Sequence, residues 1–337
     1  MYYLQEQTHT VVMAFETCPL RPLYFWEIDI GMKMDPGNFA IETFLFCQIT
    51  VGMFGNSSIL FYYIILIFTE KHLTPKDLII EHLTFANYLT VILRGFPQTM
   101  SYFGFKNFLD DMGCKLIVYI SRITREVSLY AMCLLSCFQA ITISPNNSRW
   151  IKLKYRATKY IGPSCSVSWL VHLLLNILTP LRESGTNYKK NATNRLSYGY
   201  CSLFASDSVA TTLYISLVCF SDVFCLGLMA CSSISMVSIL YRHKRQVKHI
   251  HSAQHFLKVS PEDRATQTIL ILLCTFVISY SFSSIVAIIR TYLNYPVIWG
   301  VNIFTSLEIF FPMFCPFVLI TNMRSSSNLF LPCLGKR

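Results

Sequence analysis

The chain has 337 residues, of which 53% are hydrophobic and only 14% are charged, and it carries a formal net charge of +10. Soluble globular domains are about 25% charged, so this composition excludes an ordinary soluble domain and indicates an integral membrane protein. The basic excess is explained by Lys and Arg beside membrane spans, so we do not expect nucleic acid as a partner.

The first 40 residues are predicted to form an extracellular N-terminal tail. They lack a basic segment followed by a continuous apolar run, the pattern of a signal peptide. We therefore expect the first membrane span to act as the insertion signal. Met32 and Met34 are alternative start sites to Met1, and a start at either one would leave a very short tail.

Seven stretches are long and apolar enough to cross a bilayer, which takes about 20 residues or more when the helix is tilted. They are predicted at residues 41–69, 78–100, 113–143, 160–181, 209–241, 266–292 and 298–321. The expected fold is an all-α membrane protein, a seven-transmembrane helix bundle formed by one domain at 41–321. A short cytoplasmic tail at 322–337 follows.

The distribution of Lys and Arg predicts the orientation of this bundle. Both residue types gather in the connections at 70–77, 144–159 and 242–264 and in the C-terminal tail. Cytoplasmic loops carry such an excess, so the N-terminus is predicted outside and the C-terminus inside.

Two features fall on the predicted external side. Asn191 begins an Asn-Ala-Thr sequon between spans four and five and is the predicted glycosylation site. Cys114 and Cys201 also lie on this oxidising side, where disulfides persist. We expect them to join the outer end of span three to the loop before span five; the alternative is two unpaired thiols.

Charged residues inside the third span predict a ligand pocket. Arg122, Arg125 and Glu126 lie at a depth where a charge is costly unless it faces the bundle interior or a wet cavity. Arg122 and Arg125 lie three residues apart and so share a helix face. The hypothesis is that Arg125, with or without Arg122, binds an anionic or hydrogen-bonding ligand group. The alternative is internal pairing with Glu126, with Asp222, or with Glu308 of span seven. The pocket candidates are Arg122, Arg125, Glu126, Tyr119, Tyr280 and Glu308.

Seven spans, an external N-terminus and the expected bridge suggest a G-protein-coupled receptor. Gly55-Asn56 resembles the Gly-Asn pair of the rhodopsin-like class. Other motifs of that class are altered: Asn87 stands in place of an aspartate, Gln139 in place of the Asp-Arg-Tyr arginine, and Cys315-Pro316 in place of Asn-Pro.

These departures themselves form a pattern, because the chain resembles the vomeronasal type 1 receptors, a mammalian pheromone-receptor family. The resemblance covers nearly everything beyond Asn38, and its most specific stretches are His82 to Met100, Cys133 to Pro145, Ser260 to Val277 and Pro316 to Ile320. It implies a plasma-membrane sensory receptor, small odorant- or steroid-like ligands, and a heterotrimeric G protein of the inhibitory type.

The predicted loop between spans three and four has a chemistry of its own. The segment SRWIKLKYRATKY contains five basic residues and no acid. It can attract anionic lipids of the inner leaflet at about 1 kcal/mol per charge, and it lies where a G protein would dock. The candidates for facing the G protein are Gln139, Arg149, Lys152, Lys154, Arg156 and Arg264.

We find no metal-ligand spacing, nucleophile elbow or phosphate loop in the sequence, so neither an enzyme nor a cofactor is expected. Two other interpretations remain open. A seven-span transporter or channel would predict broken helices and an inverted repeat. A receptor remnant that no longer signals would retain the fold alone.

Overall fold

The computed structural model describes residues 36–70, 73–103, 109–145, 147–177, 183–184, 195–197, 202–204, 209–250, 261–293 and 298–326. Residues 37–337 form one compact unit. Residues 1–35 of the predicted N-terminal tail, Asn191 and Cys201 lie outside the described residues, whereas residues 36–40, also predicted as tail, form the start of the first helix.

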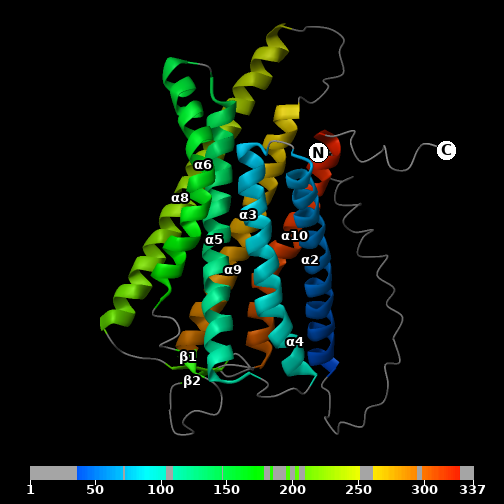
Figure 1. The fold of residues 1–337 in the computed structure, drawn as a ribbon, viewed down its shortest axis with the longest axis vertical. Helices are drawn as coiled ribbons and strands as arrows, with labels where there is room; N and C mark the ends of the chain where they lie inside the picture. Colours follow the sequence, from blue (N-terminus) through cyan, green and yellow to red (C-terminus); the bar gives the residue numbers. More distant parts are fainter. Residues whose placement is uncertain are drawn as a thin grey trace, which may run out of the picture. The chain divides into compact units, whose positions relative to one another are not determined.

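The described chain is a bundle of seven membrane helices, which confirms the predicted fold class (Figure 1). Its elements are α2 (Pro36–Phe68), α3 (Pro75–Thr90), η1 (Val91–Gly95), α4 (Phe96–Tyr102), α5 (Asp111–Ile143), α6 (Ser148–Leu175), α8 (Val209–Ile250), α9 (Pro261–Leu293) and α10 (Ile298–Ser326). Within the described ranges, α2, α5, α8, α9 and α10 are long and apolar enough to span a membrane unaided. The second span is divided into α3, η1 and α4, and the first half of α6 is strongly basic.

The second span is not the continuous α-helix that its hydropathy predicts. Five residues, Val91–Gly95, form a turn of π-helix between α3 and α4. Pro97 stands two residues after Gly95, and a proline inside a helix removes one backbone hydrogen bond and clashes with the preceding turn. A wider π-turn accommodates such a disruption and is frequent at functional sites. It also holds Arg94, whose side chain is buried inside the bundle.

The fourth helix begins twelve residues before the predicted boundary at Tyr160. Residues 149–159, predicted as a loop, continue the α-helix from Ser148. Arg, Lys, Leu and Ala are good helix formers, and no Gly or Pro interrupts the segment before Gly162-Pro163. Hydropathy finds only the part of a helix that is apolar, so the basic turns were missed.

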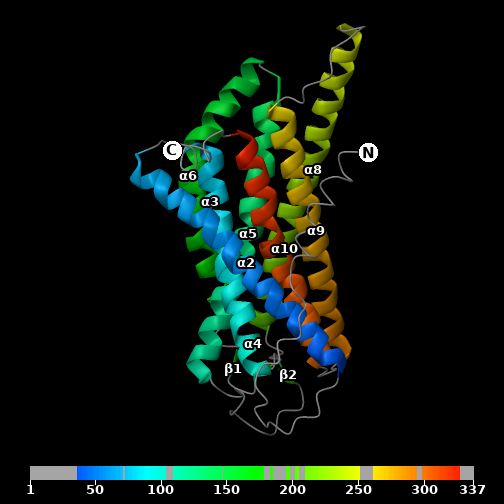
Figure 2. The same ribbon diagram turned by 90° about the vertical axis from the view of Figure 1, so that its right-hand side faces the viewer.

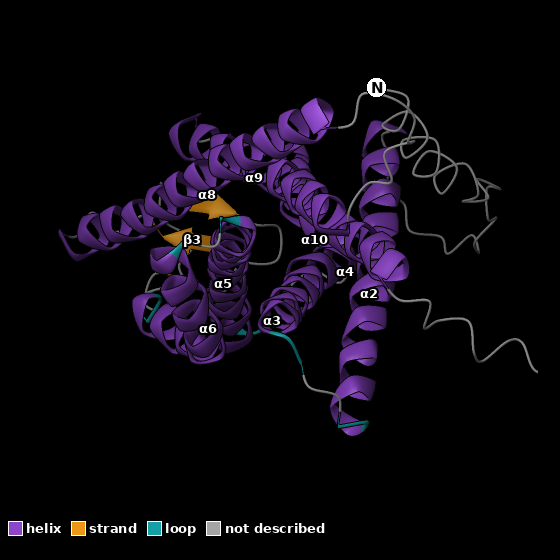
Figure 3. Ribbon diagram, turned by 90° about the horizontal axis from the view of Figure 1, so that it is seen from above, coloured by secondary structure: helices purple, strands orange, loops and turns teal. Residues whose placement is uncertain are grey.

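Helix α5 lies at the centre of the bundle and contacts α3, α6, α8 and α9. Seen from above, these helices surround it (Figure 3). One large apolar cluster joins α5 to α8 and α9, and its fully buried members include Met132, Leu135, Met229, Met236 and Leu272. This packing fixes the rotation of α5 about its axis, and hence the direction of each of its polar side chains.

Helices α2 and α10 approach each other closely where they cross (Figure 2). Asn56 donates its Nδ2 proton to the Pro312 carbonyl at 2.9 Å. A Cβ atom on Gly55 would lie 2.9 Å from the Pro316 Cβ, so only a residue without a side chain fits there. Small residues permit this kind of approach between membrane helices.

A small antiparallel sheet lies at the end of the bundle where α5 begins (Figure 1). It consists of β1 (Glu183–Ser184), β3 (Ser202–Phe204) and β2 (Arg195–Ser197) in the order β1-β3-β2. Cys114, in the first turn of α5, is buried and disulfide-bonded. Because Cys201 is not described, its pairing with Cys114 stays a prediction.

Candidate functional site: a charged cavity in the bundle

One face of α5 borders an internal cavity. Ser121, Arg125 and Ser128 follow the spacing i, i+4, i+7, which places them on one side of a helix. The cavity has a volume of about 40 Å³. The other helices that line it contribute Asn87, Thr90, Arg94, Phe276, Ser279, Tyr280, Ser283, Leu307, Glu308, Phe311 and Pro312.

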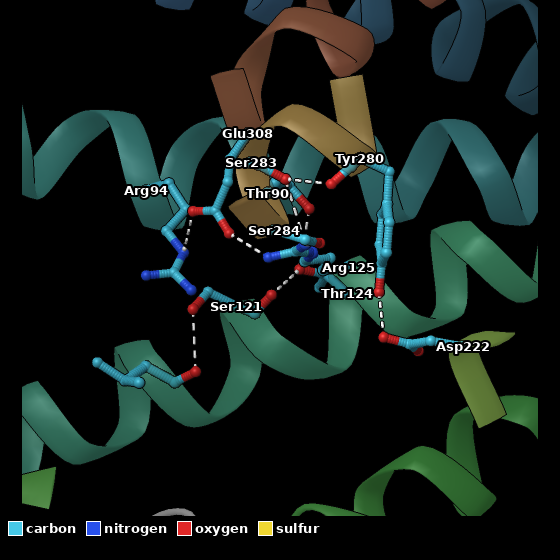
Figure 4. A network of polar contacts seen from close by, with 11 residues as sticks. Thr90, Arg94, Ser121, Thr124, Arg125, Asp222, Tyr280, Ser283, Ser284 and Glu308 are labelled. Carbon is cyan, nitrogen blue, oxygen red and sulfur yellow. Dashed lines mark hydrogen bonds and ion pairs between the residues drawn. The ribbon is translucent and has the colours of Figure 1, made fainter. Parts of the chain in front are cut away.

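Two arginines share one carboxylate in this cavity (Figure 4). Arg125 Nη1 donates to Glu308 Oε1 at 2.8 Å, and Arg94 Nε lies 3.3 Å from Glu308 Oε2. The Glu308 side chain is only 3% exposed. We call Arg94, Arg125 and Glu308 the charge cluster. With two arginines and one glutamate, it gives the lining residues a formal excess of one positive charge.

The guanidinium of Arg125 is also held from the α9 side. Its Nη2 donates to the hydroxyls of Ser283 at 3.2 Å and Ser284 at 3.3 Å. Its central carbon lies 4.4 Å from the centroid of the Tyr280 ring, within the range of a cation–π contact. The Tyr280 hydroxyl in turn donates to Asp222 on α8. A continuous chain of contacts thus joins α10, α5, α9 and α8 at one level of the bundle.

Hydroxyl groups form the opposite wall of the cavity. The Thr90 and Thr124 hydroxyls are 3.0 Å apart, and Ser128 donates to Asn87 Oδ1 at 2.9 Å. Buried polar groups of this kind are hydrogen-bonded as a rule. The lining of the cavity is therefore polar beside α3. It is aromatic beside α9 and α10, where Phe276 and Phe311 meet edge to face.

The side of α5 next to the cavity-facing side contacts α6 and Asn176, the residue that caps the C-terminus of α6. Glu126 Oε2 accepts a hydrogen bond from Asn176 Nδ2 at 2.6 Å and lies 3.0 Å from His172 Nδ1. The Tyr119 hydroxyl donates to the Leu173 carbonyl at 2.8 Å. Tyr119 and Glu126 are seven residues apart and so share a face, which is turned away from that of Arg125.

The structure therefore separates the six predicted pocket residues. Arg125, Tyr280 and Glu308 line the cavity, whereas Tyr119 and Glu126 contact α6. Arg122 is half-buried on α5 and is not among the lining residues.

Sequence reasoning did not single out Arg94 or the serines of α5. The rule that selected Arg125, a charge within a membrane span, applies equally to Arg94. The i, i+4, i+7 spacing around Arg125 would have found Ser121 and Ser128. Within the described part of the chain, no group of three or more His, Cys, Asp or Glu side chains is arranged to hold a metal ion.

The residues predicted to face a G protein lie at the end of the bundle where α5 ends, opposite the small sheet. Gln139 Nε2 donates to Thr266 Oγ1 at 3.1 Å and joins α5 to α9 through two buried side chains. Lys154 Nζ donates to the Ser144 carbonyl at 2.8 Å, just beyond the C-terminus of α5. Three others lie exposed on α6 and one on α9; they are Arg149, Lys152, Arg156 and Arg264.

The fold is that of the rhodopsin-type seven-helix receptors. The crystal structure of squid rhodopsin superposes with a TM-score of 0.64 over 90% of this chain and 83% of that one, at 17% sequence identity. This likeness defines the class of fold, a seven-transmembrane helix bundle.

The sequence places the chain in one family of that class. The profile of the "Vomeronasal organ pheromone receptor family" matches residues 39–331. Human vomeronasal type-1 receptor 4 is 43% identical over 274 residues, covering 81% of this chain and 91% of the relative. Human vomeronasal type-1 receptor 2 is 38% identical over 325 residues, covering 96% and 78%. Rat vomeronasal type-1 receptor 90 is 30% identical over 305 residues, covering 88% and 94%.

The chain belongs to the vomeronasal type 1 receptor family, which confirms the predicted resemblance. It is a G-protein-coupled chemosensory receptor and a multi-pass protein of the plasma membrane.

Proposed function

We propose that the receptor binds a small odorant- or steroid-like ligand in the cavity around Arg125. One observation carries this assignment: Glu308 is the single carboxylate among the cavity-lining residues, and it is shared by two arginines. The excess positive charge favours a ligand with an anionic or hydrogen-bond-accepting group. Aromatic and apolar side chains on α9 and α10 suit the remainder of such a molecule.

Binding in this cavity requires the bundle to change. The present volume of about 40 Å³ holds a few water molecules, far less than a steroid skeleton occupies. A ligand group that competes with Glu308 for Arg125 would weaken a contact between α5 and α10. The ligand then stabilises a conformation in which α5 and α10 have moved apart. It thereby shifts the receptor's equilibrium from its resting state to its active state.

The signal is proposed to reach an inhibitory-type G protein on the cytoplasmic side. The positive-inside distribution of Lys and Arg supports an external N-terminus. On the inner side, the Gln139–Thr266 hydrogen bond joins α5 to α9 where many relatives of rhodopsin have an arginine. A neutral bond of this kind contributes about 1 kcal/mol, so it is easily broken when α9 moves. Lys154 and Arg264 lie near the same end and are proposed to face the G protein.

The test compares two arginines of the same helix. Cells expressing the receptor with an inhibitory G-protein reporter would receive odorant mixtures and matched neutral and carboxylate-bearing steroids. Arg125→Ala is expected to lower the response at least tenfold at equal surface density. Arg122→Ala is the matched control, because Arg122 does not line the cavity; it should respond like wild type.

Other outcomes decide between the remaining interpretations. A full response from Arg125→Ala would refute the pocket assignment. Loss of surface protein in Arg125→Ala alone would assign the arginine to internal pairing. Uptake or current without any G protein would favour the transporter or channel, and a surface-expressed receptor that never couples would be a non-signalling remnant.

A further inference from the structure

The first half of α6 carries a continuous row of cations. Arg149, Lys152, Arg156 and Lys159 follow the spacing i, i+3, i+7, i+10, which places them along one side of the helix. We call these four residues the basic stripe. All four are exposed, and α6 contains no Asp or Glu from Ser148 to Leu175.

No protein group neutralises this stripe within the described part of the chain. The Glu308 carboxylate, which pairs with Arg94 and Arg125, lies inside the bundle and not beside the stripe. Lys154 provides the contrast, since it lies on the opposite side of α6 and donates to the Ser144 carbonyl. Lys154 therefore points into the bundle and makes a structural hydrogen bond, whereas the side chains of the basic stripe point away from the bundle.

Large apolar side chains flank the stripe and are themselves exposed. Tyr155 is 71% exposed, Tyr160 is 58% exposed and Ile151 is 53% exposed. The Lys159 ammonium lies 5.8 Å from the centroid of the Tyr160 ring. Aromatic residues next to cations are typical of segments at the membrane–water interface, where one side of the residue meets lipid and the other meets headgroups.

The half of the stripe nearest the apolar segment of α6 matches the headgroup layer. The helix continues from the stripe, through Gly162 and Pro163, into a mainly apolar segment that ends at Leu175. Ten residues separate Lys159 from Arg149, which corresponds to a rise of about 15 Å. The polar layer of one leaflet is roughly 5–8 Å thick, so Lys159 and Arg156 fall within it. Lys152 and Arg149 lie beyond it, about 10 Å and 15 Å from Lys159 along the helix.

We propose that the basic stripe of α6 binds the headgroups of anionic phospholipids in the cytoplasmic leaflet. Phosphate and carboxylate oxygens complement Arg156 and Lys159, while Lys152 and Arg149 add to the positive potential that attracts anionic lipid. The exposed tyrosines suit the adjoining lipid. Helix α6 packs mainly against α5 and α3 and lies at the edge of the bundle (Figure 3). The stripe is therefore open to lipid on the outer side of the receptor. The choice of leaflet rests on the orientation given under Proposed function; the binding itself does not.

The experiment measures lipid binding to the full receptor without ligand or G protein. Receptor in neutral detergent is titrated with short-chain phosphatidylserine, with short-chain phosphatidylcholine and with inorganic phosphate, and bound molecules are followed by native mass spectrometry. We expect phosphatidylserine to bind more tightly than either of the others and to be weakened by salt. R156Q/K159Q should lower its affinity roughly 10- to 30-fold, at about fivefold per charge.

Two further variants keep the result specific. R242Q/R245Q removes the same charge from exposed positions of α8 and should leave binding to the stripe within about twofold, since each contribution is local. R149K/R156K keeps the charges and should bind like wild type. Equal losses in both glutamine variants would overturn the proposal in favour of a general charge effect. Unchanged lipid binding by R156Q/K159Q, with lost G-protein coupling in neutral nanodiscs, would assign the stripe to the G protein.

Discussion

Arg125 and Glu126 are consecutive residues of α5, yet they belong to two different regions of the bundle. Arg125 points to α9 and α10, where it shares Glu308 with a second arginine beside a cavity. Glu126 points to α6, where Asn176 and His172 contact the same carboxylate oxygen. A charge within a membrane span therefore does not by itself identify a ligand site; what surrounds the charge does.

The polar groups of the two regions differ in how they are packed and paired. On the α6 side, a carboxylate and its partners are packed between two helices, as in an ordinary buried hydrogen-bond network. On the α10 side, one carboxylate is divided between two cations and adjoins open volume. Buried ion pairs seldom add net stability over apolar side chains of the same size, so we expect the charge cluster to matter more for function than for folding.

The largest effect should follow removal of the shared carboxylate. Glu308→Leu leaves Arg94 and Arg125 buried without their counter-ion, which costs about 3–5 kcal/mol in the free energy of unfolding. Thermal unfolding of the purified receptor measures this loss. The triple variant Arg94→Met, Arg125→Met, Glu308→Leu should recover most of the stability while abolishing the ligand response. A Glu308→Leu receptor as stable as wild type would show that the cluster is not desolvated.

A smaller loss is expected on the α6 side. Glu126→Leu leaves the donors on Asn176 and His172 unsatisfied, at a cost of about 1–3 kcal/mol. Glu126→Gln keeps one acceptor oxygen and should cost less. Neither change should shift the ligand concentration for half-maximal response once surface density is matched. A shift of more than about threefold would place Glu126 in the pocket after all.

The sequence predicted the two regions with unequal success. Hydropathy found all seven spans, and the cost of an intramembrane charge selected Arg125 and Glu126 together. The rotation of α5 could not be predicted, because it depends on which apolar residues of α8 and α9 pack against it. Arg94 lies within the predicted second span, so the same charge rule applies to it. The π-turn that holds it could not be predicted, because it depends on local backbone geometry next to Pro97. The helical first half of α6 was not predicted because a basic helix looks like a loop on a hydropathy scale.

The smallest expected effects come from a matched pair of tyrosines, one on each side of α5. Tyr280 donates its hydroxyl proton to Asp222 and Tyr119 donates to the Leu173 carbonyl. Replacing either by Phe removes one hydrogen bond and keeps the ring, so each should lower stability by about 0.5–1.5 kcal/mol. In Tyr280→Phe the remaining ring would still lie against the Arg125 guanidinium, which retains the cation–π contact.

The ligand response should nevertheless separate these two variants. Tyr280→Phe breaks the last contact, to Asp222, in the chain that begins at Glu308 and passes through Arg125. The concentration–response curve of this variant should shift by about 3- to 10-fold, the equivalent of one hydrogen bond. Tyr119→Phe should give the wild-type curve, because its bond to α6 does not adjoin the cavity. Equal shifts in both variants would mean that the whole of α5 transmits the signal and that its two sides are not functionally distinct.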